Sequence, residues 1–164
     1  MARLEGKPIM PTSRAGRDRR GFSLLELLVV LLLLALSSAL VLPAIDRGLK
    51  ERELKQSALE LAAVARDLRR RAVYENALQY LVLNPSENSY QTLPGDKVLL
   101  PPDVMMTGIE GGEPAEEGLR RFLFFPNGSA LGGEIGISSR QGSGYIIQLE
   151  PLTGRVVVVQ RKAR

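Results

Sequence analysis

Histidine, cysteine and tryptophan are absent from this chain of 164 residues, and aromatic residues make up only 5% of it. Without cysteine the chain has no disulfide, no catalytic thiol and no thiolate metal site. Without histidine it lacks the commonest acid–base group and metal ligand. There is also no phosphate-binding Gly-Lys-Ser/Thr motif, and Gly142-Ser143-Gly144 does not match a nucleophile elbow. We therefore expect a protein that is not an enzyme, with no catalytic residue, no bound metal and no cofactor.

The net charge of +4 belongs entirely to residues 1–21, which hold six of the 22 basic and two of the 18 acidic side chains. The rest of the chain carries 16 basic and 16 acidic side chains and is neutral. The high isoelectric point of about 9.7 therefore gives no indication of nucleic-acid binding. Because residues 1–21 are polar and lack hydrophobic periodicity, we interpret them as a leader that does not belong to the fold.

Residues 22–42 are apolar apart from Ser23, Glu26, Ser37 and Ser38. As a helix this segment spans roughly 30 Å, which is enough to cross the hydrocarbon core of a bilayer. A carboxylate in such a run is costly and is a functional candidate by default. The simpler alternative for Glu26 is a side chain that reaches the lipid headgroups beside the basic leader. The carboxylate alone does not decide between these two interpretations.

A resemblance to a known family rests on one octet and the apolar run after it. The octet is Arg19-Arg20-Gly21-Phe22-Ser23-Leu24-Leu25-Glu26, and it resembles the processing site of type IV prepilins and type II secretion pseudopilins. The resemblance implies that a membrane-bound prepilin peptidase cuts between Gly21 and Phe22. It implies that the same enzyme methylates the new amino group of Phe22, and that Glu26 serves assembly with other pilin-like subunits.

The basic leader predicts the orientation of the chain. Lys and Arg close to a membrane segment stay in the cytoplasm, so we expect a single-pass protein of the inner membrane whose head lies in the periplasm. The alternative is an ordinary secretory signal peptide that is cleaved at Ser37-Ser38-Ala39. That alternative leaves Glu26 unexplained and cuts a helical pattern that continues well beyond Ala39.

We expect one helix over residues 22–76, with residues 22–42 as its transmembrane part. Pro43 removes one hydrogen bond and clashes with the carbonyl of Ala39, which predicts a kink near the end of the apolar run. Farther along, apolar residues recur with spacings of 4, 3, 4, 3 and 4, as on one buried helix face: Leu54, Ala58, Leu61, Ala65, Leu68 and Ala72. The alanines favour close packing on a sheet. The three arginines at 69–71 are expected on a solvated face, and Asn76 is expected to end the helix.

Residues 77–164 are expected to form a β-rich head. Their patterns predict strands at 78–83, 89–93, 97–100, 104–107, 119–125, 134–138, 145–149 and 155–160. Residues 156–159 have no polar alternation and are expected to be buried on both faces. The segment 108–118 is rich in Gly and Glu and predicts a mobile loop. Its glutamates lack the spacing of a calcium-binding loop: Glu110, Glu113, Glu116 and Glu117.

The head carries a second, less specific resemblance. Residues 122–133 read Phe-Leu-Phe-Phe-Pro-Asn-Gly-Ser-Ala-Leu-Gly-Gly, an aromatic strand that enters a tight turn, and Thr153-Gly154-Arg155-Val156 follow later. This head is similar to the H-type minor pseudopilin of type II secretion and to the related minor pilins of type IV pili. The resemblance implies an α+β, type IV pilin-like fold, in which a long N-terminal helix packs on an antiparallel β-sheet head. Phe122, Phe124 and Phe125 are expected in its core.

Three functions follow as hypotheses. The first is a minor pseudopilin that joins other major and minor pseudopilins in protein secretion across the outer membrane. The second is a minor pilin of a type IV pilus, with pilus priming or DNA uptake as its task. The third is an anchored periplasmic binding domain that never assembles. Nucleic acid is not expected as a partner, because the basic tail at 161–164 is short and lacks interleaved aromatics.

Overall fold

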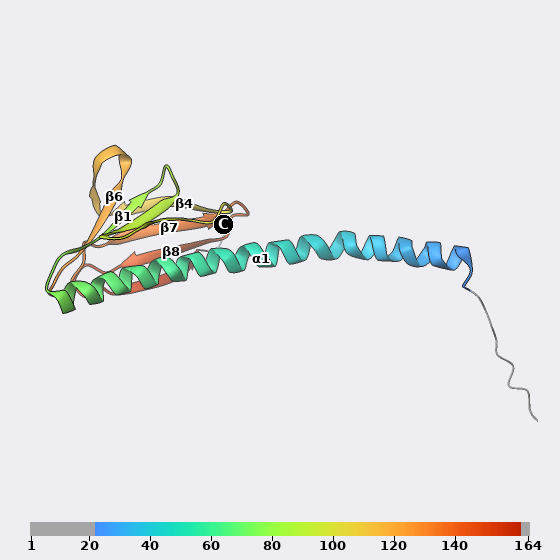
Figure 1. Ribbon diagram of the computed structural model, residues 1–164, viewed down its shortest axis with the longest axis horizontal. Coiled ribbons are helices and arrows are strands. Elements are labelled where there is room, and N and C mark those ends of the chain that lie inside the picture. The colour runs from blue at the N-terminus through green and yellow to red at the C-terminus, as the bar shows by residue number, and fades with distance from the viewer. Residues whose placement is uncertain (1–21, 162–164) are drawn as a thin grey trace, which may run out of the picture. The chain divides into compact units, whose positions relative to one another are not determined.

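The computed structural model describes residues 22–161, without the side chains of residues 40, 42–44 and 117. The predicted cleavage position Gly21 lies outside the described residues. The chain divides into two compact units, Met1–Val41 and Leu42–Arg164. A long helix comes first in the described part, and nine strands and one short 3-10 helix follow it (Figure 1).

The helix α1 (Leu24–Glu75) has nearly the predicted bounds. It ends because Asn76 takes the left-handed conformation, with a φ of 50°. The N–H of Ala77 then donates to the carbonyl of Ala72 at 3.2 Å, the closing bond of a Schellman motif. The prediction that Asn76 ends the helix is confirmed. The backbone on both sides of Pro43 is helical, and the kink expected there stays a prediction.

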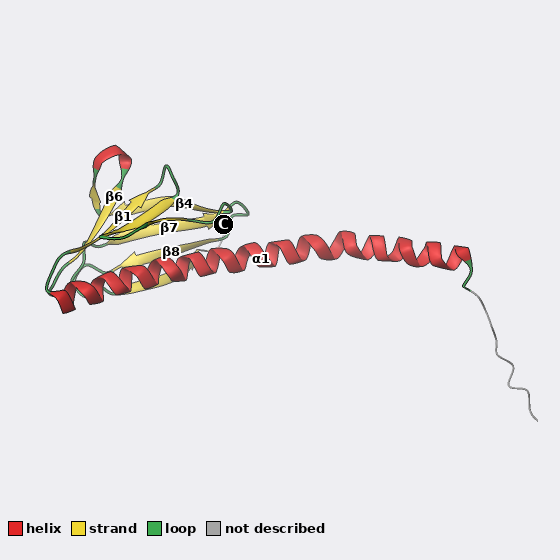
Figure 2. Ribbon diagram, viewed as in Figure 1, coloured by secondary structure: helices red, strands yellow, loops and turns green. Residues whose placement is uncertain are grey.

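The head is antiparallel, as predicted, and its strands divide into two sheets (Figure 2). One sheet has the order β3-β2-β1-β6-β5 and the other has the order β4-β7-β8-β9. Most strands lie within two residues of their predicted bounds. They are β1 (Gln79–Asn84), β2 (Ser89–Leu93), β3 (Lys97–Leu99), β4 (Val104–Gly111), β5 (Glu113–Pro114), β6 (Arg120–Phe124), β7 (Gly133–Ser139), β8 (Gly144–Leu149) and β9 (Val156–Arg161).

The prediction of a mobile loop at 108–118 is wrong. β4 continues to Gly111 and pairs with β7 as far as Gly133, with a register shift between Met106 and Gly108. β5 then joins the other sheet, and the 3-10 helix η1 (Glu116–Gly118) follows it. Gly111 and Gly112 have φ values of 77° and 64°, so these glycines let the chain pass from one sheet to the other. A composition that is typical of loops here serves a sharp crossing between strands.

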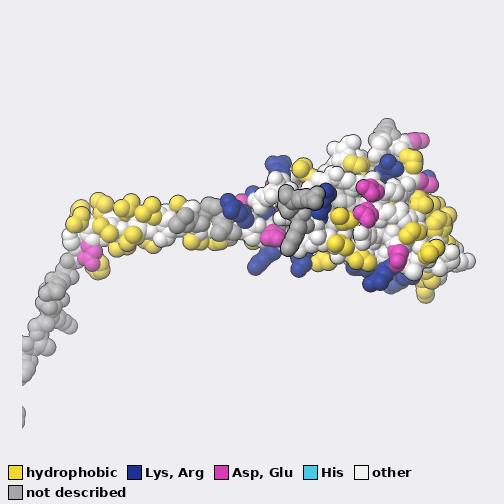
Figure 3. Space-filling model, turned by 180° about the vertical axis from the view of Figure 1, so that it is seen from behind, with side chains coloured by type: hydrophobic (Ala, Val, Ile, Leu, Met, Phe, Trp, Pro, Cys, Tyr) yellow, Lys and Arg dark blue, Asp and Glu magenta, His cyan; other side chains and the backbone are white. Residues whose placement is uncertain are grey.

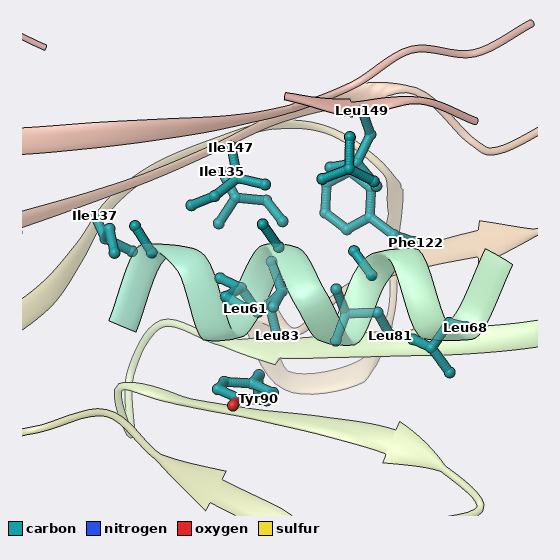
Figure 4. Packing of buried hydrophobic residues seen from close by; sticks show 14 of the residues in the cluster. Leu61, Leu68, Leu81, Leu83, Tyr90, Phe122, Ile135, Ile137, Ile147 and Leu149 are labelled. Atoms are coloured by element: carbon teal, nitrogen blue, oxygen red, sulfur yellow. The ribbon is translucent and has the colours of Figure 1, made fainter. Parts of the chain in front are cut away.

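The predicted apolar face of α1 forms the centre of the core. All six residues of the stripe from Leu54 to Ala72 are at most 2% exposed, and Ala62 joins them. Figure 4 shows Leu61 among side chains that include Ile135 and Ile147 of the four-stranded sheet, with Leu81 and Leu83 of the five-stranded sheet close by. Burial of each of the three leucines in this stripe stabilises the head by about 1.5–3 kcal/mol.

Two expectations about the head core are wrong. Phe122 and Phe124 are fully buried, whereas Phe125 is only half-buried, because it follows β6 and begins the turn. In β9, Val156 is buried but Val159 is 41% exposed. β9 is an edge strand of its sheet, so its apolar run does not indicate burial on both faces. Val158 lies against the core from the inner side.

Candidate processing and assembly segment

Phe22 and Ser23 precede α1 and lead into its first turn. The side chain of Phe22 is 81% exposed. The N–H of Leu27 donates to the carbonyl of Ser23 at 3.1 Å, which makes Ser23 the N-cap residue. Glu26 lies in the first turn of the helix and is exposed. The structure therefore brings two of the predicted site residues, Phe22 and Glu26, within about one helical turn of each other.

The sequence interpretation missed the position of Glu26 relative to the helix end. Ser23 at the N-cap and Glu26 three residues later match the Ser-x-x-Glu pattern of a capping box. A carboxylate in the first turn also interacts favourably with the helix dipole. The Ser-x-x-Glu pattern was visible in the sequence. In this structure the helix dipole is therefore the local effect on Glu26, whereas its assembly role is what the family resemblance implies.

The first turns of α1 present a continuous apolar surface. Each leucine and valine from Leu24 to Leu36 is between 42% and 81% exposed. Figure 3 shows hydrophobic side chains gathered along this part of the helix. No helix in the described part of the chain combines the length and the apolar character that a membrane crossing requires. Pro43 follows in the same helix but is 17 positions from Glu26, so it is not part of the first-turn site.

The prediction that the arginines at 69–71 lie on a solvated face is wrong for Arg69. Its side chain is half-buried, and its Nε donates to the carbonyl of Gly128 at 3.0 Å. One turn earlier, Nη2 of Arg66 donates to the carbonyl of Val156 at 3.4 Å. Gly154 has a φ of 60°, and a Cβ on it would lie 2.3 Å from the Gly128 oxygen and 2.8 Å from Cδ of Arg69. These contacts fasten the end of α1 to two turns of the head.

The other two arginines are held by Asp67 on the same helix. Arg70 pairs with one carboxylate oxygen of Asp67, and Nε of Arg71 lies 2.7 Å from the other. The hydrogen bond from Arg70, together with the charges of Arg71 and Arg70, holds the pKa of Asp67 below its usual value, although partial burial opposes this shift. Because Asp67 offsets part of their charge, Arg70 and Arg71 do not form a free basic tract for an anionic ligand.

The glutamates between β4 and β6 do not gather into a metal site in the part of the chain that is described. Glu113 pairs with Arg121, whose Nε lies 2.5 Å from its Oε1. Arg121 also lies over the ring of Tyr80, with its Cζ 5.5 Å from the ring centroid. Among the described residues no three acidic side chains converge on one point. Glu113 is therefore held by Arg121 in a structural ion pair.

Residues 16–42 match the family described as the prokaryotic N-terminal methylation motif, which covers the octet and the apolar run. The fold is similar to the minor pseudopilin EpsH from the type 2 secretion system of Vibrio cholerae, with a TM-score of 0.54 and 13% sequence identity. That match covers 66% of this chain and 97% of EpsH. The chain therefore has a type IV pilin-like fold, and a prokaryotic N-terminal methylation motif precedes its head. No curated protein matches it by sequence.

The pilin-like fold is also similar to the type IV minor pilin FimU of Pseudomonas aeruginosa. The TM-score is 0.51 at 14% identity, and the match covers 69% of this chain and 96% of FimU. The long N-terminal helix and the antiparallel head predicted from the sequence are thus the fold of this group. The methylation motif and the pilin-like fold thus occur together in one chain.

Proposed function

We propose that this pilin-like chain is a minor pseudopilin, a structural subunit of a type II secretion pseudopilus that serves protein secretion across the outer membrane. The observation that carries the proposal is the presence of the methylation motif and a pilin-like head in one chain. The resemblance of residues 122–133 to H-type minor pseudopilins, which minor pilins share, and the likeness to EpsH support the choice of a pseudopilus. The chain contributes packing surfaces and an anchor, and it is not an enzyme.

The first step in this function is removal of the leader. Prepilin peptidase cuts between Gly21 and Phe22, and the amino group of Phe22 is then methylated. The exposed position of Phe22 just before α1 supports this step, because residues 22 and 23 lie outside the helix and are open to an enzyme. The mature subunit begins at Phe22.

The apolar surface of the first turns then anchors the subunit in the inner membrane. Exposed leucines at this density are stable only when another apolar phase covers them. Before assembly that phase is the lipid, with the amino end of the helix at the cytoplasmic side and the head in the periplasm. Within the filament the covering surface comes from neighbouring major and minor pseudopilins. Pro43 weakens the helix near the end of this segment and lets it adjust during assembly.

Glu26 directs the assembly step. Within one subunit its carboxylate stabilises the first turn of α1, and in the filament it pairs with the methylated amino group of a neighbouring Phe22. A carboxylate that leaves water needs such a charged partner, because an unpaired buried charge is strongly destabilising. The exposure of Glu26 in the isolated chain supports this pairing, since its carboxylate is accessible to another subunit.

The second candidate is a minor pilin of a type IV pilus, with pilus priming or DNA uptake as its task, and the similarity to FimU favours it. Deletion of the gene separates the two candidates. A pseudopilin mutant loses secreted proteins from the culture medium and keeps pilus-dependent motility and DNA uptake. A minor-pilin mutant shows the reverse pattern, and a mutant that keeps both activities contradicts both proposals.

The role of Glu26 is tested with Glu26→Ala, and Glu51→Ala on the same helix is the matched control. Glu26→Ala should keep membrane retention and leader removal, but it should reduce co-purification with other pilin-like subunits by about tenfold or more, because a charge pair is lost. Glu51→Ala should assemble like the wild type. Assembly of Glu26→Ala at the wild-type level would leave the carboxylate with its local role at the helix end.

A further inference from the structure

The two sheets of the head end in four edge strands in the described part of the chain, and three of these edges are unsuited to further pairing. β5 has two residues, one of them Pro114, which has no N–H to donate. β3 has only three residues. β4 contains the register shift, and Asn88 occupies its free edge. The Asn88 amide group donates to the carbonyl of Val104 and accepts from the N–H of Met106 at 2.9 Å.

β9 is the exception. It has six residues, contains no proline, and pairs with β8 from Leu149↔Val156 to Gly144↔Arg161 without a register shift. Natural proteins protect a long edge with charged residues, proline or a bulge. β9 has no proline and no bulge, its four valines are uncharged, and its only charged residue is Arg161 at the end. The edge of β9 is therefore open where the other three edges are short or covered.

The register defines which backbone groups this open edge presents. The N–H of Glu150 donates to the carbonyl of Arg155. Since hydrogen-bonded and non-hydrogen-bonded pairs alternate in an antiparallel ladder, residues 157, 159 and 161 bond to β8. Residues 156, 158 and 160 direct their N–H and C=O groups away from it. Arg66 covers the carbonyl of Val156, and among the described residues nothing is bonded to the N–H and C=O groups of Val158 and Gln160.

The charges around this edge indicate its occupant. Arg155 and Arg161 stand before and at the end of β9, both exposed, and Arg66 reaches its first residue. The acidic residue nearest in sequence, Glu150, already accepts a hydrogen bond from Thr153 at 2.6 Å. Glu150 keeps its negative charge, but Arg66 and Arg155 outnumber it at the start of the edge and Arg161 stands at the end, so both ends are net cationic and the middle is apolar. An extended segment with apolar residues between acidic ends complements this pattern.

We propose that the edge of β9 binds an extended segment of a partner protein, which adds to the four-stranded sheet as a fifth strand. The segment pairs with the backbone groups of Val158 and Gln160. Its apolar side chains lie beside Val157 and Val159, and its acidic ends pair with Arg155 and Arg161. Backbone bonds supply affinity in such strand addition, and the alternating side chains supply specificity. The proposal concerns the head alone and does not depend on which filament the chain joins.

The test uses the full chain in detergent and a fluorescent peptide, Glu-Thr-Val-Thr-Val-Thr-Glu, whose glutamates and valines share one face of an extended strand; its binding is followed by anisotropy. A peptide with lysine at both ends is the charge control. We expect saturable binding of the acidic peptide, at least tenfold weaker binding of the lysine peptide, and slower hydrogen exchange at the amides of Val158 and Gln160 when the acidic peptide is bound. Equal binding of the two peptides, or unchanged exchange at these amides, would overturn the proposal.

Two variants separate the edge from the rest of the surface. Gln160→Pro removes an edge-facing N–H at an exposed position and should weaken peptide binding at least tenfold, whereas Gln160→Ala keeps this N–H and should bind like the wild type. Both variants should melt within a few degrees of the wild type, because the lost N–H does not bond to β8. Wild-type peptide binding by Gln160→Pro contradicts the proposal. So does self-association of the wild-type chain that Gln160→Pro abolishes, since the occupant is then a second copy.

Discussion

The apolar side chains at the beginning of α1 are exposed, whereas those toward its end are buried. From Leu24 to Leu36 the leucines and valines are exposed by 42% or more, whereas from Leu54 to Ala72 the apolar stripe is at most 2% exposed. The first stretch is apolar on all sides, and the second confines its apolar residues to one face. Both are regular helix, so local structure does not distinguish them. The difference teaches that the second stretch is covered by its own chain and the first requires a cover from outside.

The largest effect is expected from a charge on the covered face. Ala65 is fully buried, and Ala65→Glu should lower the free energy of unfolding by about 3 kcal/mol or more in a fragment that begins at residue 46, because the carboxylate has no partner there. Thermal or urea unfolding followed by circular dichroism measures this loss. The matched control is Ala63→Glu, two residues away on the exposed side, which should change stability by less than about 0.5 kcal/mol. Equal melting of both variants would show that the packing face is wrong.

A smaller effect is expected where the end of α1 meets the turns of the head. Gly154→Ala should cost roughly 2–3 kcal/mol, because Gly154 has a φ of 60° and its added Cβ would lie 2.3 Å from the Gly128 oxygen. Gly108→Ala is the control, since nothing lies within 4 Å of a Cβ at Gly108. Urea unfolding of the same fragment compares the two. If Gly154→Ala is no less stable than Gly108→Ala, the close contact between Gly154, the Gly128 carbonyl and Arg69 does not exist.

The smallest effect concerns pH. Because the folded-state pKa of Asp67 is lowered, chiefly by the hydrogen bond from Arg70, its contribution to stability is present above the unfolded pKa of about 3.9 and is lost as pH falls through the folded value. Asp67→Asn should therefore lower stability at neutral pH by about 0.5 kcal/mol or less, since the pair is partly exposed. The difference should vanish in strong acid. A deficit of Asp67→Asn that persists there would rule out the charge as its cause.

Most of the fold was predictable from local patterns. The spacing of Leu54, Leu61 and Leu68 and the alanines between them identified the buried face, because a helix that packs along one side leaves a period in its sequence. Asn76 was identifiable as the helix end for a similar local reason. The division into two sheets was not predictable, since it depends on pairing between strands far apart in sequence. The same limit explains β9, whose valines resemble a central strand although it lies at an edge.

The site was less predictable from physics than the fold. Gly21, Phe22 and Glu26 were identified through resemblance to a family motif, and no spacing rule alone assigns cleavage or methylation to them. The capping position of Glu26 was visible as Ser-x-x-Glu and was overlooked. Arg69 was assigned to a solvated face because a run of arginines carries no local information about a distant turn. Its contact with Gly128 spans 59 positions in sequence and emerges only when the head is folded.

The central claim is that the exposed first stretch of α1 begins a processed, assembling subunit. Mass spectrometry of the N-terminus of the membrane-bound protein tests it most directly. We predict that the wild-type chain begins at Phe22 with a methylated amino group, and that Gly21→Val, which places a side chain at the cleavage position, keeps the leader attached. A wild-type chain that begins at Met1, or at Ala39 or Leu40 after cleavage as a secretory signal peptide, would contradict the account.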